Sequence, residues 1–313
     1  MTCVAVGGPG HLTIFAGSWD KDIWTWNVAS RTAGRKYSGH SDFVKAVVCV
    51  ELGGKDVLIS GGADKKIIVW DVESGARLHT VQDPAVPMMA VQHLAVDPVE
   101  SGPDEAVLVC ASSDPHIRRW RVRLDSVEQI TEAPPGTSGP ARPLILEHET
   151  TVYKLVFDTD NEDVDLWTAS GDGTAKCLSR VKGFTADDSV SHGDHVRATV
   201  VTEQWIVTAG RDEHVKVWDR ASGKLYCTLE GHYDEVTDLV VLAAGAATGP
   251  RVVSVSIDGT VRTWSLSKPE LDRVLEEQEA RAKGVKKETA AETSAGQLTA
   301  EEEAELAALM DED

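Results

Sequence analysis

An aspartate recurs at a fixed distance before a bulky residue through most of the chain. In the stretch "GSWDKDIWTWNV" (residues 17–28), Asp20 stands six residues before Trp26, and five further units keep the same offset. Those units are Asp64–Trp70, Asp114–Trp120, Asp172–Leu178, Asp212–Trp218 and Asp258–Trp264. Successive anchors lie 44, 50, 58, 40 and 46 residues apart. Self-similarity at a period of this size indicates a chain built from stacked supersecondary units, so we expect six repeats over residues 1–266.

A histidine precedes the first apolar run of four units. In each case a Val follows four residues later: His40/Val44, His148/Val152, His192/Val196 and His232/Val236. Each Val opens a run such as "VKAVVCV" or "VTDLVVL". Short apolar runs rich in β-branched residues and bounded by turn residues predict buried strands.

With six aligned Asp, five aligned Trp and four aligned His, the chain resembles the WD40-repeat β-propeller family. The resemblance implies an all-β fold in which each repeat forms a four-stranded antiparallel blade around a central channel. It also implies a hydrogen-bonded tetrad of His, strand Ser or Thr, turn Asp and Trp indole in each complete repeat. Three sets are complete: His40, Ser60, Asp64, Trp70; His192, Thr208, Asp212, Trp218; and His232, Ser254, Asp258, Trp264. The unit at Leu178 lacks the Trp, and the units at Trp26 and Trp120 lack the His.

The two ends of the repeat array do not match the family pattern. The last repeat ends at "VRTWSL" with no strand pattern after Trp264, and the chain begins "MTCVAV", where the first strand of the first unit belongs. In the family, a strand from the N-terminus usually closes the ring. We therefore expect six recognisable blades, either as a ring with improvised closure or as a seven-bladed ring that lacks its N-terminal piece.

A helical, acidic tail follows the repeats. Residues 267–284 predict a helix, with Ser267 as its cap and Glu270 at the capping-box position. Residues 285–297 predict a disordered linker. Residues 298–313 predict a short acidic helix, on which Leu306, Leu309 and Met310 make an apolar face. The Pro/Gly-rich stretch 125–147 predicts a long loop.

Charge and cysteine content limit the classes of partner. The formal net charge is −20, of which residues 267–313 carry −8, with 14 Asp and Glu against 6 Lys and Arg. Because nucleic-acid binding depends on basic patches, we expect no direct binding of nucleic acid, and none to an anionic membrane. The five cysteines form no C-x-x-C pair, which is typical of buried reduced thiols. No signal peptide is evident, so we expect a cytoplasmic or nuclear protein.

No motif predicts catalysis, a cofactor or a metal site. His192 and His195 stand three residues apart in "SHGDH", but a metal site needs three or four convergent ligands, and His192 belongs to a tetrad. "SGGADKK" is not a phosphate-binding loop, and no nucleophile elbow occurs. We therefore predict that the chain is not an enzyme, and that it holds no cofactor and no metal.

The candidate binding surface is one rim of the propeller. In the family, the residue before each turn Asp and the residue before each opening Val meet on one rim. Several of these positions carry large or charged side chains in place of small polar turn residues: Trp19, Phe43, Arg211, Ile257 and His195. Trp and Arg are enriched in binding hot spots; scattered exposed apolar residues are also ordinary on protein surfaces. For Trp24, inter-blade packing is the preferred interpretation and a binding role the alternative.

The favoured function is a protein-interaction scaffold that binds proteins or peptides on this rim, as one part of a multi-protein complex. Two alternatives stay open. One is a substrate receptor of a ubiquitin ligase, although "WDRA" at 218–221 and "WRVR" at 120–123 do not match the Trp-Asp-x-Arg motif of such receptors. The other is a non-catalytic subunit of a larger enzyme complex.

Overall fold

Six antiparallel sheets follow one another along the chain. The computed structural model describes residues 1–83, 87–131, 144–160, 162–242 and 249–295. The first sheet contains β1 (Cys3–Gly7), β2 (Thr13–Gly17), β3 (Asp22–Asn27), β4 (Thr32–Ala33) and β5 (Tyr37–Ser38). A 3-10 turn, Pro9–His11, joins β1 to β2. The second sheet contains β6 (Val44–Leu52), β7 (Lys55–Gly62), β8 (Ile67–Asp71) and β9 (Arg77–Val81). The third contains β10 (Val91–Val96), β11 (Ala106–Ser112), β12 (Asp114–Val122), β13 (Val127–Gln129) and β14 (Leu144–Leu146).

The remaining three sheets keep the same order of strands. The fourth contains β15 (Val152–Phe157), β16 (Leu166–Ser170), β17 (Thr174–Ser179) and β18 (Thr185–Ser191). The fifth contains β19 (Val196–Val201), β20 (Trp205–Gly210), β21 (Val215–Asp219) and β22 (Leu225–Leu229). The sixth has three described strands, β23 (Val236–Leu242), β24 (Arg251–Ser256) and β25 (Val261–Ser265). The prediction of a six-bladed, nearly all-β propeller is confirmed.

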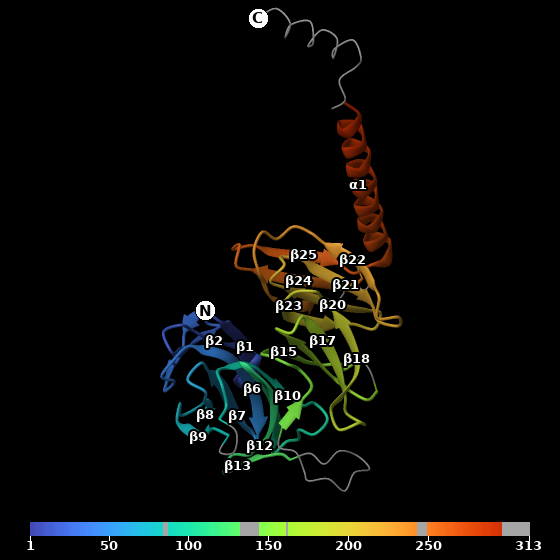
Figure 1. Cartoon of the computed structure of the whole chain (residues 1–313). Helices are drawn as coiled ribbons and strands as arrows, with labels where there is room; N and C mark the ends of the chain where they lie inside the picture. Colours follow the sequence, from blue (N-terminus) through green and yellow to red (C-terminus); the bar gives the residue numbers. More distant parts are fainter. Residues whose placement is uncertain (84–86, 132–143, 161, 243–248, 296–313) are drawn as a thin grey trace, which may run out of the picture.

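The blades are arranged around their first strands. β6 packs between β1 and β10, β15 packs between β10 and β19, and β19 packs against β23. Among the described residues, no strand of the sixth blade packs closely against a strand of the first. Figure 1 shows these two blades, blue and orange, at the two ends of the series.

The turn after each repeat Asp has the same backbone conformation in most blades. The next residue takes a positive φ at Lys21, Lys65, Gly173, Glu213 and Gly259. Glycine accepts this region freely, and other residues accept it at a small cost. The carboxylate of the Asp compensates for that cost because it accepts a backbone N–H two residues on, as in the bond from Lys66 N to Asp64 at 3.3 Å and from Thr260 N to Asp258 at 2.7 Å.

The interior blades are buried on both faces, whereas the end blades are not. All residues of β7 from Val57 onward are buried, as are those of β8 up to Trp70. On the first blade, alternate residues of β1 and β3 instead face solvent, among them Val4, Val6, Trp24 and Trp26. The predicted inter-blade packing of Trp24 is therefore not what the structure shows. No sheet among the described residues covers that face, and Trp24 Nε1 instead donates to Asp20 at 2.8 Å.

One long helix follows the last blade. α1 spans Lys268–Ala295, so its backbone continues beyond residue 284, where the sequence predicted the helix to end, and through most of the stretch 285–297 predicted as a linker. That stretch contains no Pro, and Gly284 alone costs a helix about 1 kcal/mol relative to Ala. The acidic segment predicted at 298–313 and its three apolar residues lie outside the described residues.

Candidate protein-interaction site

Three blades contain the complete polar set expected from the repeat. In the second blade, His40 Nδ1 lies 2.9 Å from Asp64 Oδ1, and His40 Nε2 lies 2.8 Å from Ser60 Oγ. Trp70 Nε1 donates to the same Ser60 oxygen at 2.8 Å. The fifth blade repeats the set with His192, Thr208, Asp212 and Trp218, and the sixth with His232, Ser254, Asp258 and Trp264. Each set therefore ties the loop before a blade's first strand to the second and third strands.

The tetrad carboxylates are held in their charged form. Burial acts to raise the pKa of Asp64, but hydrogen bonds from His40 and from Ser41 N outweigh it, so the pKa lies below its ordinary value. The pKa of Asp212 is lowered further. Burial again opposes the shift, while His192 and Lys216 favour the carboxylate. A glycine permits the close packing of the second-blade set, because a Cβ at Gly62 would lie 2.5 Å from both His40 and Asp64.

In the third blade an arginine replaces the missing histidine. Arg118 is fully buried, and its Nε donates to Asp83 at 3.0 Å. Its Nη1 donates to Ser112 at 3.0 Å and to Asp114 at 3.2 Å. Ser112 thus meets a guanidinium in place of an imidazole, and no hydrogen bond satisfies Trp120 Nε1 within the described residues.

One feature of the sequence indicates this replacement. Arg118 stands four residues after the turn Asp, and the same position holds Lys176, Lys216 and Arg262 in three units that do have the His. Lys216 Nζ contacts Asp212 at 2.7 Å and the carbonyl of His192 at 2.6 Å. A cation at this position reaches the turn Asp or the His loop, so an Arg there, in a unit without a His, indicates a substitute.

The first and fourth blades have incomplete sets. In the fourth, His148 Nδ1 lies 2.8 Å from Asp172 and its Nε2 lies 2.7 Å from Thr168, while buried Leu178 fills the place of the Trp. In the first, Asp20 has no His partner and remains exposed.

Backbone hydrogen bonds bring the candidate rim residues to one end of the blades. In five blades the residue before the turn Asp donates its N–H to the carbonyl of the residue before the opening Val. The five bonds are Ala63–Phe43, Ser113–Ala90, Gly171–Thr151, Arg211–His195 and Ile257–Glu235, at 2.7–3.0 Å. The approach is close enough that a Cβ at Gly210 would lie 1.9 Å from the His195 carbonyl oxygen.

The rim residues differ in how free they are to meet a partner. Trp19 is 67% exposed and stacks on half-exposed Phe43, with ring centroids 5.3 Å apart. Ile257 is exposed, whereas His195 is only partly exposed. Arg211 pairs with Asp194 at 3.2 Å, yet more than half of its side chain is exposed. The structure therefore places an aromatic pair on the first and second blades, and a cation and an aliphatic side chain on the fifth and sixth.

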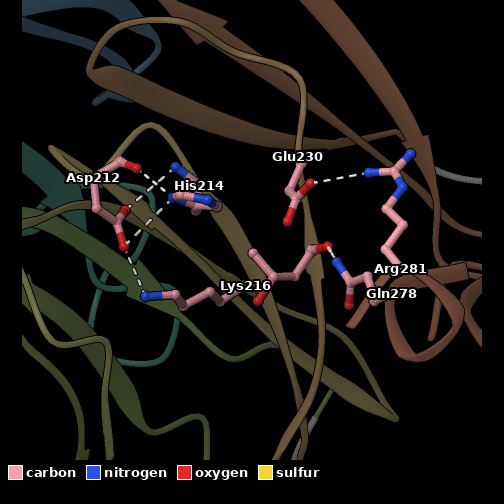
Figure 2. A pocket seen from close by; sticks show the side chains of 7 residues that line it. Asp212, His214, Lys216, Glu230, Gln278 and Arg281 are labelled. Carbon is pink, nitrogen blue, oxygen red and sulfur yellow. Dashed lines mark hydrogen bonds and ion pairs between the residues drawn. The ribbon is translucent and has the colours of Figure 1, made fainter. Parts of the chain in front are cut away.

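A groove that the sequence did not reveal lies beside this rim, between the fifth blade and α1. It has a volume of about 460 Å³ and is lined by Asp212, His214, Lys216, Thr228, Glu230, Gln278 and Arg281. Figure 2 shows these side chains on the two walls, with Gln278 and Arg281 on the helix. Gln278 donates to the Thr228 carbonyl, and Arg281 lies 3.4 Å from Glu230. A second groove of about 350 Å³ continues to Gly231, His232 and Tyr233 and shares His214 and Glu230 with the first.

Two further features of the described residues concern reactive chemistry: groups of metal-binding side chains and cysteine thiols. Within the described ranges, no three His, Cys, Asp or Glu side chains gather into a group that could hold a metal ion. Burial raises the pKa of Cys49, Cys110 and Cys177 to about 12, which disfavours a reactive thiolate. No described helix is both long enough and apolar enough to cross a membrane.

Known proteins match the chain over most of its repeats. The WD domain, G-beta repeat model matches residues 190–219 and 223–265, and the model for the tRNA methyltransferase TRM82 WD40 domain matches residues 37–135. An uncharacterized WD repeat-containing protein of Schizosaccharomyces pombe is 31% identical over 256 residues, which is 81% of this chain and 62% of that protein.

More distant relatives match a similar share of the chain. The nuclear distribution protein PAC1 of Arthroderma otae is 28% identical over 273 residues, or 84% of this chain and 49% of PAC1. The WD repeat-containing protein 26 homolog of Arabidopsis thaliana is 24% identical over 258 residues. The chain thus spans 62% of the length of the Schizosaccharomyces pombe protein and 49% of the length of PAC1. Its repeats, its six blades and these matches together confirm the predicted family: the chain is a member of the WD40-repeat β-propellers.

Proposed function

We propose that the chain is a non-enzymatic scaffold that binds protein partners on its rim, and that it serves as the non-catalytic subunit of a tRNA methyltransferase complex. The rim part of the proposal rests on one observation above all, the exposed stack of Trp19 on Phe43. Two neighbouring blades hold this pair in place. A partner can therefore bury the apolar surface of the two rings without the cost of ordering their side chains. WD40 propellers are generally scaffolds of this kind, and within the described residues no group of His, Cys, Asp or Glu side chains could hold a metal ion.

The match to the TRM82 domain model supports the choice of complex. It covers the second and third blades, including the fully buried substitute Arg118. The acidic charge of the chain fits a subunit that contacts the enzyme and leaves the polyanionic tRNA to its partner. Such a role is compatible with either the cytoplasm or the nucleus.

Reconstitution tests this function. The chain is mixed with the purified catalytic subunit of the tRNA methyltransferase from the same organism, and methyl transfer to tRNA is measured. We expect the two proteins to form a complex in which transfer is faster than with the catalytic subunit alone. We also expect the chain alone to bind no tRNA and to transfer no methyl group. A lack of complex formation, or activity of the chain alone, would overturn the proposal.

Variants of the rim then test the surface. Trp19→Ala and Arg211→Ala should each weaken the complex by about 2 kcal/mol if they act as hot spots. Trp24→Ala is the matched control, because Trp24 is also an exposed tryptophan of the first blade but belongs to the uncovered face of β3 and is not one of the rim positions. Equal losses for Trp19→Ala and Trp24→Ala would contradict a rim site.

The ubiquitin-ligase alternative gains no support from the arginines near the repeat anchors. Arg220 contacts Asp158 of the preceding blade and the Thr202 carbonyl, and Arg123 pairs with Glu105 at 2.7 Å. Both therefore join parts of the propeller to one another.

A further inference from the structure

We infer that α1 and the rim loops of the fifth and sixth blades form one docking surface for a positively charged protein partner. This corner surface comprises residues 211–214, 230–235 and 268–283. The inference rests on the proposed function, because it assigns the chemistry of the partner. The sequence had suggested the rim as the binding surface, and the structure places Gln278 and Arg281 of α1 beside the turn residue Asp212 of the fifth blade.

The course of α1 along the fifth blade carries the argument. Near its start, Leu271 is buried in the core that contains Trp205, and Tyr226 OH donates to Asp272. Further along, Gln278 reaches Thr228, and Arg281 reaches Glu230, which is just past the end of β22. The helix therefore runs beside β22 toward the loop that leads to His232 on the rim, and its backbone continues to Ala295.

The corner between helix and rim is hollow and partly apolar. The two grooves meet at His214 and Glu230, between the helix wall and the rim loops. Tyr233, at the rim end of the second groove, is 80% exposed. Ile257, one of the rim candidates, is exposed and is bonded through its backbone to Glu235. An exposed tyrosine at the end of a groove is a typical anchor for a protein partner.

Charge decides what kind of partner fits. Residues 211–214, 230–235 and 268–283 hold ten carboxylates and five Lys and Arg. Lys216, on the wall of the first groove, adds a sixth cation, so the net charge stays negative and the partner surface should be positively charged. The ion pair of Arg281 with Glu230 is weak because both side chains are more than half exposed, so a cation of the partner can compete for Glu230. A nucleic acid would meet repulsion here, whereas a Lys- and Arg-rich protein surface would be attracted.

Two substitutions and a matched control test the surface. Glu213→Lys reverses one charge in the second groove, at a turn position where Lys21 and Lys65 occupy the same positive-φ conformation, so folding should be preserved. Tyr233→Ala removes the anchor. Glu73→Lys makes the same charge change on an exposed turn of the second blade. Against the catalytic subunit, we expect a roughly tenfold weaker Kd for each of the first two variants and an unchanged Kd for Glu73→Lys.

Hydrogen exchange on the full chain separates this inference from the proposed function. With the catalytic subunit bound, residues 228–235 and 268–283 should gain protection together. A deca-lysine peptide is the second probe, and it should protect the same residues in a salt-sensitive manner. Complex formation with unaltered exchange at the helix, or wild-type affinity of Glu213→Lys, would overturn the corner surface. Protection by deca-lysine without binding of the subunit would uphold the surface and refute the proposed function, and absence of both would refute both.

Discussion

The first and second blades share the same repeat pattern in sequence but have different surroundings in the structure. In the second blade, neighbours cover both faces, and the His40, Ser60, Asp64 and Trp70 set is buried and complete. In the first, Val4 is 68% exposed and the equivalent Asp20 bonds only locally and to Trp24. The sixth blade resembles the first on its outer face, where Val261 is also 68% exposed. An apolar strand therefore contributes to the core of a propeller only where a neighbouring blade covers it.

The largest effect should come from the interior third blade. Arg118→Ala would leave Asp83 buried without its guanidinium partner, and removing one member of a buried ion pair costs roughly 3–5 kcal/mol. Chemical denaturation measures the loss. A change below about 1 kcal/mol would show that the interior blades do not depend on their polar ties, and the contrast with the end blades would then rest on apolar burial alone.

Substitution of the repeat aspartate in each of the two blades tests the comparison directly. Asp64→Ala would strand buried His40 and should destabilise the protein by about 1–3 kcal/mol. Asp20→Ala, the same change at the same repeat position, should leave the melting temperature almost unchanged because Asp20 is exposed. Equal shifts in the two thermal melts would contradict the distinction between the blades.

Low pH should destabilise the protein through the blades that contain His–Asp pairs. The pKa values of Asp172 and Asp212 lie below their ordinary value in the fold, so the native state binds protons less readily than the unfolded chain. The stabilisation is complete above the unfolded value, near pH 4, and is lost as the pH falls below it. Asp212→Asn should be less stable than wild type at pH 7 and should lose less stability between pH 6 and pH 3. A parallel loss in both proteins would argue against this source of acid sensitivity.

Local opening should follow the same contrast between blades. Residues 1–28 and the described part of 236–266 should exchange their amide hydrogens before residues 40–75, because an end blade breaks fewer contacts when it opens. The three-stranded sixth sheet also leaves one side of β25 unpaired among the described strands. Native-state hydrogen exchange gives the order, and uniform protection of all six blades would refute it.

The smallest effect should come from the uncovered face itself. Trp24→Ser and Trp26→Ser replace exposed residues, so each should change the free energy of unfolding by under about 0.5 kcal/mol. The same changes should reduce binding of a hydrophobic dye, which reports exposed apolar surface. A large destabilisation would mean that this face is covered in solution.

Much of the fold could be predicted because the repeat is a local signal. The six-residue offset from Asp to the anchor places a turn and the following strand within one short segment, and the His–Val spacing places the next blade's first strand. Asp64, Asp212 and Asp258 were selected on these offsets, and each lies beside the His of its own repeat. The rim pairs could be selected in the same way, because each joins two loops of one repeat.

What the sequence alone determined is therefore the six repeats of this chain and the strand register within each, since these depend on spacings along the chain. Only the tertiary structure decided which faces are covered, what partner Arg118 meets and where the tail lies. Arg118 finds Asp83, 35 residues earlier, and α1 meets β22 although the whole sixth blade lies between them in the sequence. No repeat specifies these spacings. Burial and long-range pairing depend on which segments become neighbours in space. For that reason, an apolar residue at the same repeat position is buried in the second blade and exposed in the first.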